Sequence, residues 1–202
     1  MPEAAIFDYG VGNLLSLRTA MEKVGLKTKI TVSSKQLSSA DAIALPGVGN
    51  FSAAATKLAR VKQTLLDAAE KGTPLIGICL GLQLFFPESE EGPGEGLGIF
   101  EGKNVRLRDA GIKVPHMGWN TLRILKPSKF FESVQDNSYV YFVHSLYPVP
   151  TNKKIVATET EYGTKFASAV VSNNIFGTQF HPEKSGDVGL MILKNFANIV
   201  KR

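Results

Sequence analysis

Over its first 86 residues, the chain alternates between short apolar runs and segments in which apolar side chains recur at helical spacing. Short apolar runs that stop at a glycine or a proline are typical of buried strands, whereas spacings of three and four residues are typical of helices. The predicted strands are residues 4–9, 26–32, the start of 42–51, and 73–79, and the predicted helices are those between Asn13 and Gly25, over 52–71 and over 80–86. This order predicts a parallel sheet with helices on both faces.

The second half of the chain changes character after a loop rich in glycine, proline and glutamate at residues 87–102. Its strand-like pieces, separated by turns, are KNVRLR, TLRIL, YVYFVHSLY, KIVATETEY, FASAVV and IFGTQF. A last amphipathic helix is predicted from Leu190, Leu193, Phe196 and Val200. Because no internal repeat or long linker divides the chain, we expect a single domain over residues 1–202. The predicted fold is α/β, with an open, mostly parallel sheet, flanking helices and a smaller antiparallel β layer in the C-terminal half.

The composition is that of an ordinary globular protein, with 44% hydrophobic and 20% charged residues. The net charge of +5 raises the question of a nucleic-acid partner. Lysine and arginine are scattered, however, and no basic run is longer than a pair such as Lys153 and Lys154. A mildly basic surface therefore explains the charge better than nucleic-acid binding does, and an acidic protein partner stays open.

The sequence also bears on the compartment in which the protein works. The N-terminal residues MPEAAIFDYG carry an acid at position 3 and no basic leader before an apolar stretch, which argues against a secretory signal. No apolar run is long enough to cross a membrane. Cys79 is the only cysteine, so an internal disulfide is impossible, which suits a reducing compartment. We therefore expect a cytoplasmic protein without a membrane span.

Cys79 stands where a predicted strand runs into a predicted helix, in the sequence GICLG. This spacing of glycines is typical of a nucleophile elbow, a tight strand-to-helix turn that presents a reactive side chain. Glycine removes side chains that would collide at such a turn, and the N-terminus of the following helix favours a thiolate. The N–H group of Leu80 could then stabilise an oxyanion. The pattern alone does not separate this hypothesis from a buried structural cysteine.

A nucleophilic cysteine needs a base, and the chain contains three histidines. His181 follows a strand-like run, Pro182 ends that strand, and Glu183 lies two residues after His181. Along an extended path the carboxylate of Glu183 could reach back to the imidazole and orient it. Taken alone, His181 could be an ordinary packed or surface histidine. Together with Cys79, it predicts nucleophilic catalysis on an acyl group.

Several segments resemble those of a known family. PGVGNF (46–51), GICLGLQLFF (77–86) and FHPEKS (180–185), in this order, resemble class I glutamine amidotransferases. DYGVGNLLSL (8–17), PHMGWN (115–120) and YFVHS (141–145) look like those of the glutaminase subunits of imidazole glycerol phosphate synthases, which act in histidine biosynthesis. The resemblance covers residues 4–200.

The resemblance implies hydrolysis of the side-chain amide of L-glutamine to glutamate and ammonia, with no metal or other cofactor. Cys79 would attack the amide carbon and form a glutamyl thioester, His181 would transfer protons, and Glu183 would hold the imidazole ring. The implied oxyanion hole consists of main-chain N–H groups at Val48 and Leu80. The implied substrate-binding residues are Gly47, Gly49, Gln83, His144, Ser145 and Leu146.

The same resemblance implies a heterodimer with a cyclase subunit that is a (β/α)8 barrel, into which ammonia passes without release to solvent. The residues that match the family's partner-facing surface are Asn13, Met117, Trp119, Asn120 and Lys184. We also place His116 at this interface, because no carboxylate or nucleophile adjoins it in the sequence. Neither a nucleic-acid nor a membrane partner is implied. Partner binding is expected to raise glutaminase activity.

Two features depart from the family's pattern. Leu146 follows Ser145 where an aromatic residue is frequent, so only a backbone contact is expected there. Pro87 indicates that the preceding helix ends by Phe86. Three alternatives remain: a glutaminase of another synthase, such as one of pyridoxal phosphate or tryptophan synthesis, a non-catalytic regulatory homologue, and a cysteine peptidase or esterase. PHMGWN disfavours the first, the complete triad the second, and the H-P-E arrangement the third.

Overall fold

The computed structural model describes residues 1–10, 13–108 and 111–201, so that part of the predicted glycine loop after the first strand lies outside the described residues. The strands are β1 (Glu3–Phe7), β2 (Lys27–Thr31), β3 (Ala42–Leu45), β4 (Leu75–Ile78), β5 (Glu88–Ser89), β6 (Gly102–Arg106), β7 (His116–Ile124), β8 (Ser138–His144), β9 (Leu146–Pro150), β10 (Val156–Tyr162), β11 (Thr164–Ser172) and β12 (Ile175–Thr178). The α-helices are α1 (Leu14–Lys23), α2 (Ser34–Ser38), α3 (Phe51–Leu58), α4 (Lys62–Glu70), α5 (Leu80–Gln83) and α6 (Gly186–Val200). Short 3₁₀ helices are η1 (Lys129–Phe131), η2 (Lys153–Ile155) and η3 (Pro182–Lys184). Within the described ranges, none of these helices is both long enough and apolar enough to span a lipid bilayer.

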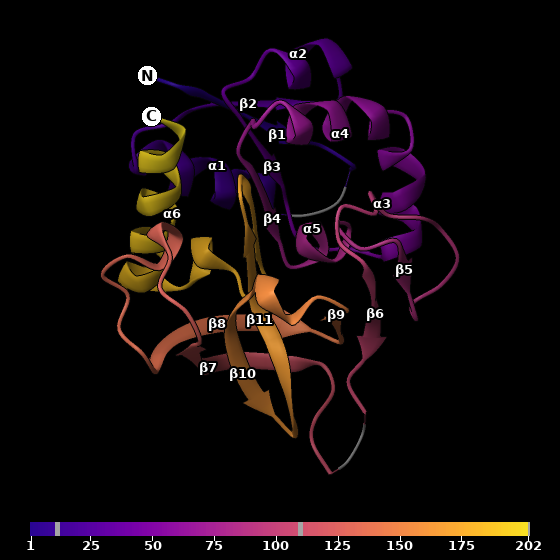
Figure 1. Ribbon diagram of the computed structural model, residues 1–202, viewed down its shortest axis with the longest axis vertical. Helices are drawn as coiled ribbons and strands as arrows, with labels where there is room; N and C mark the ends of the chain where they lie inside the picture. Colours follow the sequence, from indigo (N-terminus) through magenta and orange to yellow (C-terminus); the bar gives the residue numbers. More distant parts are fainter. Residues whose placement is uncertain (11–12, 109–110, 202) are drawn as a thin grey trace.

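The described strands form one nine-stranded sheet, in the order β2-β1-β3-β4-β12-β11-β10-β7-β8 (Figure 1), and a second sheet of β5, β6 and β9. In the first part of the large sheet, β1 pairs in parallel with β2 and β3, and β4 pairs in parallel with β3 and β12. From β12 onward the neighbours are antiparallel. The predicted α/β fold class is confirmed. Most of the antiparallel strands of the second half extend the main sheet through the β11–β12 hairpin.

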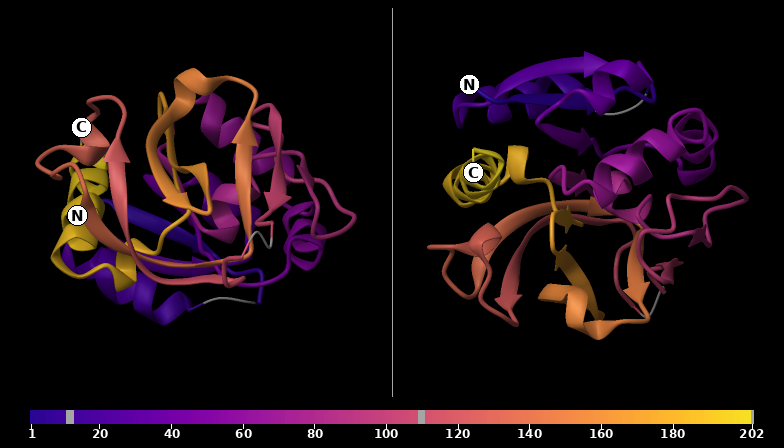
Figure 2. Two further views of the ribbon diagram at one scale, coloured as in Figure 1. Left: turned by 90° about the horizontal axis from the view of Figure 1, so that it is seen from below. Right: turned by 45° about the horizontal axis from the view of Figure 1, so that its top comes forward.

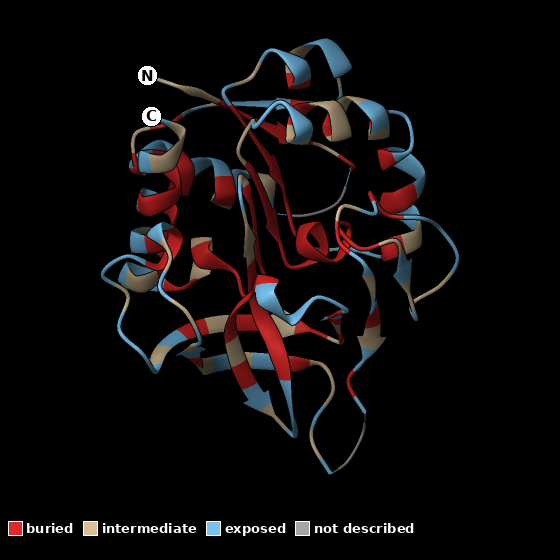
Figure 3. Ribbon diagram, viewed as in Figure 1, coloured by how far each residue is buried: buried red, intermediate tan, exposed pale blue. Residues whose placement is uncertain are grey.

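The side chains of the parallel strands alternate between two hydrophobic clusters, one on each face of the sheet. In β1, Ala4 and Ile6 belong to one cluster, and Ala5 and Phe7 belong to the other. Helices α1 and α6 cover the first face, and α3 and α4 cover the second (Figure 2). Because both faces are covered, these strands are apolar throughout their length. Figure 3 shows continuous burial along β3 and β4 and a banded pattern along β7 and β8.

The parallel pairing of β4 with β12 brings two distant parts of the chain to the same edge of the sheet. Ile78 lies opposite Thr178 in the register, at the carboxyl end of both strands. Cys79 directly follows Ile78, and His181 lies three residues after Thr178. Because Cys79 and His181 follow adjacent parallel strands at this edge, the topology alone places the two candidate catalytic side chains near each other. Ligand sites of open α/β sheets lie at the same edge.

The helix predicted over residues 52–71 is wrong in one respect, because the structure divides it into α3 and α4. Between α3 and α4 the backbone hydrogen bonds join residues three apart in place of four. The Arg60 N–H group donates to the Lys57 carbonyl, and the Val61 N–H group donates to the Leu58 carbonyl. This three-residue spacing redirects the chain without a glycine or proline, so the apolar pattern does not reveal it. Helix α2 is absent from the predicted elements because Leu37 is its one buried residue.

Candidate active site

Cys79 lies at the tight turn between β4 and α5. Its φ of 50° and ψ of −99° place it in a region of backbone conformation that is unfavourable for a residue with a side chain. The Cys79 N–H group donates to the Thr178 carbonyl at 2.6 Å, which ties the turn to the end of β12. This strained turn from strand to helix is the geometry that the GICLG segment predicts.

Gly81 permits this turn because α5 passes directly against β3. A Cβ atom at position 81 would overlap the carbonyl oxygen of Leu45. We therefore expect Gly81→Ala to lower the free energy of unfolding by about 3 kcal/mol, since backbone atoms cannot move aside cheaply. Gly72→Ala is the matched control: no atom lies within 4 Å of a Cβ there, and its φ of +86° should cost about 1 kcal/mol. Urea unfolding measures both variants, and equal losses would contradict the close approach at Gly81.

His181 and Glu183 form a buried, hydrogen-bonded pair after β12. Nδ1 of His181 lies 2.8 Å from Oε1 of Glu183, and the two side chains are 1% and 5% exposed. The His181 N–H group donates to the Tyr141 carbonyl at 2.9 Å, and the Ser185 hydroxyl donates to the His181 carbonyl at 2.6 Å. The extended path expected through this segment is wrong, because residues 182–184 form the 3₁₀ turn η3. The turn itself brings the carboxylate back to the imidazole.

The surroundings of His181 favour its protonated form. Burial alone would lower the pKa of His181, but the neighbouring Cys79 and the hydrogen bond to Glu183 outweigh burial and raise the pKa to about 10. The ring is therefore protonated at neutral pH, the form that stabilises an adjacent thiolate. Its Nε2 atom is buried and has no hydrogen-bond partner within the described part of the chain, which leaves it available for proton transfer.

Cys79 lines a cavity of about 280 Å³, near the lower end of the range for small-molecule pockets. The other predicted residues that line it are Gly47, Val48, Gly49, Leu80, Gln83, His144, Ser145 and Leu146. The loop after β3, the elbow, and the turn between β8 and β9 therefore meet around the sulfur. The structure thus brings together residues from three separate segments of the sequence, in a space that suits an amino acid.

Two main-chain segments that carry the predicted N–H donors, at Leu80 and at Val48, line this cavity. Leu80 is the first residue of α5, and an N–H group in the first turn of a helix has no acceptor within the helix. Val48 lies between two glycines in the loop after β3. Gly47 approaches the Ile78 carbonyl so closely that a side chain would overlap it, and Gly49 has a φ of 139°. Glycine is therefore required on both sides of Val48 for this loop to approach the elbow.

His144 lines the cavity and begins a chain of hydrogen bonds that leads away from it. Its Nδ1 atom donates to the Leu146 carbonyl at 2.9 Å, and its Nε2 atom lies 3.0 Å from Nδ1 of His116. Nε2 of His116 lies 3.3 Å from Nδ2 of Asn120, a half-buried residue. Burial lowers the pKa of His144 to about 3 and that of His116 to about 4, so both rings are neutral. Because both rings are neutral, this series of hydrogen bonds places the single ring proton of His144 and that of His116 on Nδ1.

The expected position of His116 at the partner-facing surface is wrong. Its ring is 3% exposed and stacks on Phe142 and Tyr162, with centroid distances of 4.7 and 3.9 Å. The reason lies in the alternation of β7, which begins at His116. Successive side chains point to opposite faces, so His116 faces inward while Met117 and Trp119 face outward.

The outward face of β7 carries an exposed cluster of large side chains. Met117 and Trp119 are 61% and 56% exposed. Trp119 packs edge-on against Tyr141 of β8, and Nζ of Lys184 lies 6.0 Å from the centre of the Tyr141 ring. Asn13 is also exposed, and its side chain caps the N-terminus of α1. Large apolar side chains that gather on an exposed face are typical of an interaction surface.

Two residues near the sulfur are absent from the sequence prediction. Glu91 lines the cavity, and its carboxylate accepts a hydrogen bond from the Phe51 N–H group at 2.5 Å. Gln179 is fully buried, and its side-chain amide donates to the Cys79 sulfur at 3.3 Å. Glu91 stands in a loop with several acids that the sequence does not distinguish. Gln179 is a polar residue at the end of a mostly apolar strand. This pattern marks it as unusual but does not indicate which residue it contacts.

Comparison with known proteins agrees with this geometry. Residues 5–200 match the family described as glutamine amidotransferase class-I. The chain belongs to the class I glutamine amidotransferase family. It is 48% identical to imidazole glycerol phosphate synthase subunit HisH of Pyrococcus furiosus, over 98% of this chain and 100% of that protein. Identity is 48% to the subunit of the same name from Methanothermobacter thermautotrophicus, over 98% of each chain, and 45% to that from Moorella thermoacetica, over 100% of this chain and 97% of the other. The family predicted from the motifs is confirmed.

This amidotransferase also shares its fold with solved structures of low sequence identity. A putative GMP synthase protein from Thermoplasma acidophilum has a TM-score of 0.79 at 21% identity, covering 100% of this chain and 94% of the other. A chain in the structure of PurLQS from Thermotoga maritima has a TM-score of 0.79 at 19% identity, covering 98% of each. These similarities bear on the fold alone.

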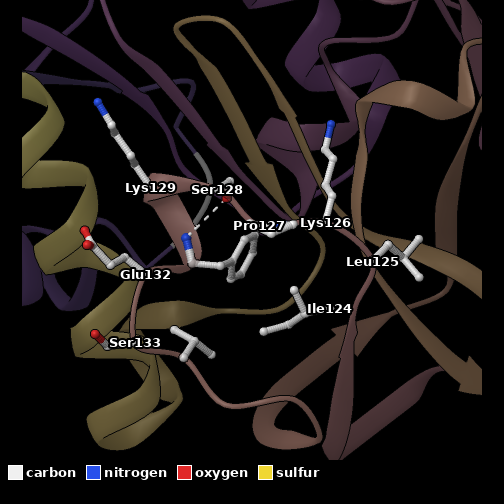
Figure 4. Close-up of a pocket in the computed structure, with 10 residues that line it drawn as sticks. Ile124, Leu125, Lys126, Pro127, Ser128, Lys129, Glu132 and Ser133 are labelled. Atoms are coloured by element: carbon white, nitrogen blue, oxygen red, sulfur yellow. Dashed lines mark hydrogen bonds between the residues drawn. The ribbon is translucent and has the colours of Figure 1, made fainter.

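The amidotransferase has a larger hollow elsewhere, of about 650 Å³ (Figure 4). One segment lines it, from Ile124 to Val134, in which the Phe131 N–H group donates to the Ser128 hydroxyl at 3.3 Å. Its lining residues include neither cysteine nor histidine. The smaller cavity is therefore the candidate active site because of its chemistry and not because of its volume.

Proposed function

We propose that this chain is the glutaminase subunit of an imidazole glycerol phosphate synthase. In this role it hydrolyses L-glutamine to glutamate and ammonia, and the ammonia passes to a cyclase subunit. The observation that carries the proposal is the strained Cys79 elbow in a cavity of amino-acid size. Beside it lies the buried His181–Glu183 pair, in which Cys79 helps to raise the pKa of the imidazole. Identities of 45–48% to the relatives named above, over nearly the whole chain, support the choice of synthase.

The first half of the reaction forms a thioester on Cys79. Protonated His181 pairs with the thiolate, and the sulfur attacks the side-chain amide carbon of glutamine. The C–N bond of the tetrahedral intermediate then breaks, and the leaving nitrogen takes a proton from Nε2 of His181. The products of this half are ammonia, a γ-glutamyl thioester and a neutral imidazole.

The second half hydrolyses the thioester. Neutral His181 takes a proton from water as the water oxygen attacks the thioester carbon. Breaking of the C–S bond restores the thiolate beside a protonated His181 and releases the γ-carboxylic acid, which loses its proton to solvent to give glutamate. Throughout, Glu183 accepts the Nδ1–H hydrogen bond, which keeps Nε2 directed to the reacting atoms and stabilises the imidazolium.

Negative charge develops on the former amide oxygen in both halves. The N–H groups of Leu80 and Val48 would stabilise this oxyanion, and each fixed donor of this kind contributes about 10²–10³-fold in rate. The two groups come from different elements, α5 and the loop after β3. Their relative placement is set by the glycine contacts described above.

Glutamine also carries an ammonium and a carboxylate group that must be oriented. Among the described residues that line the cavity, Glu91 is the one acid, and its carboxylate would pair with the ammonium. Gln83 donates to the Leu146 carbonyl at 3.0 Å, so this wall of the cavity is rigid before substrate binds. His144 and Ser145 complete the wall.

We further propose a heterodimer with a (β/α)8-barrel cyclase on the face formed by Met117, Trp119 and Lys184. Asn13 and Asn120 are the other residues that the resemblance assigns to this interface, although the side chain of Asn120 is directed to His116. Free ammonia would be protonated at neutral pH and would lose its nucleophilicity, so direct transfer to the partner is favoured. Lys184 directly follows Glu183 in η3. A partner that contacts Lys184 therefore touches the turn that holds the catalytic carboxylate, which gives partner binding a route to the site.

We expect Trp119→Ala to weaken cyclase binding by about 30-fold, because a central aromatic side chain contributes about 2 kcal/mol to such interfaces. The free energy of unfolding should change little, since Trp119 is 56% exposed. Val32→Ala is the matched control: Val32 is 67% exposed and directly follows β2, at the opposite end of the sheet. Titration calorimetry with the purified cyclase gives Kd, and an unchanged Kd for Trp119→Ala would exclude this face.

The proposed function is tested by incubating the chain with L-glutamine, with and without the cyclase and its nucleotide substrate, and measuring glutamate. Release that rises strongly with the partner is the expected result. Release that is indifferent to this partner would favour the glutaminase of another synthase. Absence of release under every condition would favour a regulatory homologue, and cleavage of peptides or esters would favour a hydrolase of another class.

A further inference from the structure

The side chain of Gln179 lies beside the nucleophile, and the reaction described above gives it no role. Gln179 directly follows β12 and is fully buried, and its Nε2 atom lies 3.3 Å from Sγ of Cys79. We propose that Gln179 is a further catalytic residue, which donates a hydrogen bond to the Cys79 sulfur and holds it as the thiolate. This inference rests on the proposed function, because it assigns Gln179 a part in the same glutaminase reaction.

The orientation of the Gln179 amide is fixed by its neighbour Gln83. Nε2 of Gln83 donates to the Leu146 carbonyl at 3.0 Å and to Oε1 of Gln179 at 3.3 Å. Because the Leu146 carbonyl can only accept, Gln83 must present its NH₂ group on this side. Gln179 must in turn present its oxygen to Gln83, so its NH₂ group faces the sulfur of Cys79.

The main chain around Gln179 is also held in place. The Gln179 N–H group donates to the Ser168 carbonyl at 2.8 Å, on the neighbouring strand β11. The preceding residue, Thr178, accepts the hydrogen bond from the Cys79 N–H group at 2.6 Å. The amide of Gln179 therefore reaches the sulfur from a strand end that is bonded to the elbow, and no loop needs to move to make this contact.

A carbonyl group beside the sulfur favours the neutral thiol, so a hydrogen-bond donor is needed to favour the thiolate. The Val143 carbonyl lies 3.6 Å from Sγ, where it can accept a hydrogen bond from the neutral thiol and would repel a thiolate. An N–H donor has the opposite effect, and hydrogen bonds to an ionised group are stronger than those to a neutral one. The Gln179 amide therefore shifts the balance toward the charged sulfur, the form that pairs with protonated His181.

Alkylation of Cys79 by iodoacetamide, followed across pH by mass spectrometry of the full-length chain, tests this inference. The reagent reacts with the thiolate, and the chain has no other cysteine. Gln179→Met retains the length of the side chain and removes the donor. We expect alkylation about tenfold slower than in the wild type near neutral pH, because a hydrogen bond to a charged group is lost. At high pH the two rates should converge, which shows that the sulfur is equally accessible.

Gln179→Glu separates this role from a purely structural one. A glutamate at position 179 retains an oxygen that accepts from Gln83, but it faces the sulfur with a carboxylate in place of a donor. We expect it to slow alkylation near neutral pH at least as much as Gln179→Met does. Gln63→Met is the matched control at an exposed position and should leave the profile unchanged. If thermal unfolding shows that Gln179→Met does not fold, Gln179→Glu decides the question.

Two results would overturn the role of Gln179: a pH profile identical to that of the wild type, or slowing by the same factor at every pH, which indicates restricted access. Failure of the proposed function gives a different result, because alkylation requires no glutamine. A wild-type chain that releases no glutamate refutes the glutaminase, whatever the alkylation profile of the variants. Normal glutaminase activity with an unshifted profile in both variants refutes the role of Gln179 alone.

Discussion

Replacement of Cys79 by serine is expected to abolish the release of glutamate from glutamine, lowering kcat by about 10⁴-fold or more. A serine hydroxyl is a far weaker nucleophile than a thiolate at neutral pH. Serine must adopt the same positive φ as Cys79, so the substitution adds no new backbone strain. The measurement is glutamate formed by the purified chain in the presence of the cyclase.

The control for Cys79→Ser uses ammonium salts in place of glutamine. Ammonia supplied from solution bypasses the thioester, so the complex that contains the variant should form the cyclised product at the wild-type rate. Thermal unfolding checks that the variant is folded. Near-normal glutamate release by Cys79→Ser would show that the nucleophile is a different group.

The elbow and the His181–Glu183 pair could be predicted from the sequence because each depends on neighbouring residues. Gly77 and Gly81 lie two positions before and after Cys79. At each of them another part of the backbone lies so close that a side chain would overlap it. Glu183 is two residues from His181. What joins the two patterns is the parallel pairing of β4 with β12, which follows from the alternation of strands and helices. The central part of the site is therefore a product of local sequence and sheet topology.

His116 shows where the same reasoning is insufficient. The predicted strand TLRIL begins at Thr121, whereas β7 begins at His116. Alternation along a strand can assign faces only to residues that are recognised as part of the strand. The inward position of His116, and its hydrogen bond to His144 across the β7–β8 pair, are therefore not predictable from PHMGWN alone.

Gln179 and Glu91 could not be predicted for a different reason. The contact between Gln179 and Cys79 joins residues separated by 100 positions, and it depends on the orientation of one amide group. Glu91 reaches the cavity from a loop whose path depends on glycine conformations, such as the φ of 156° at Gly92. Hydrophobic periodicity specifies elements and faces but not the side-chain contacts of loops and strand ends.

Glu183→Gln is expected to lower kcat for glutamine hydrolysis by about 10²–10⁴-fold. The amide has nearly the same size, but it removes the negative charge that helps to raise the pKa of His181. Its NH₂ group can also donate to Nδ1, which places the proton of the neutral ring on Nε2. A ring in that state cannot take a proton from water during hydrolysis of the thioester. Both halves of the reaction should therefore slow.

The Glu183→Gln variant has a matched control in Glu101→Gln, since Glu101 is exposed and does not line the cavity. Glu101→Gln should retain wild-type glutamate release, and both variants should retain cyclisation with ammonium salts. NMR titration of the His181 ring gives an independent readout with a definite sign. Loss of the carboxylate must lower the pKa of His181, so the ring should lose its proton at a lower pH than in the wild type. An unchanged titration together with an unchanged kcat would show that Glu183 does not act through the imidazole.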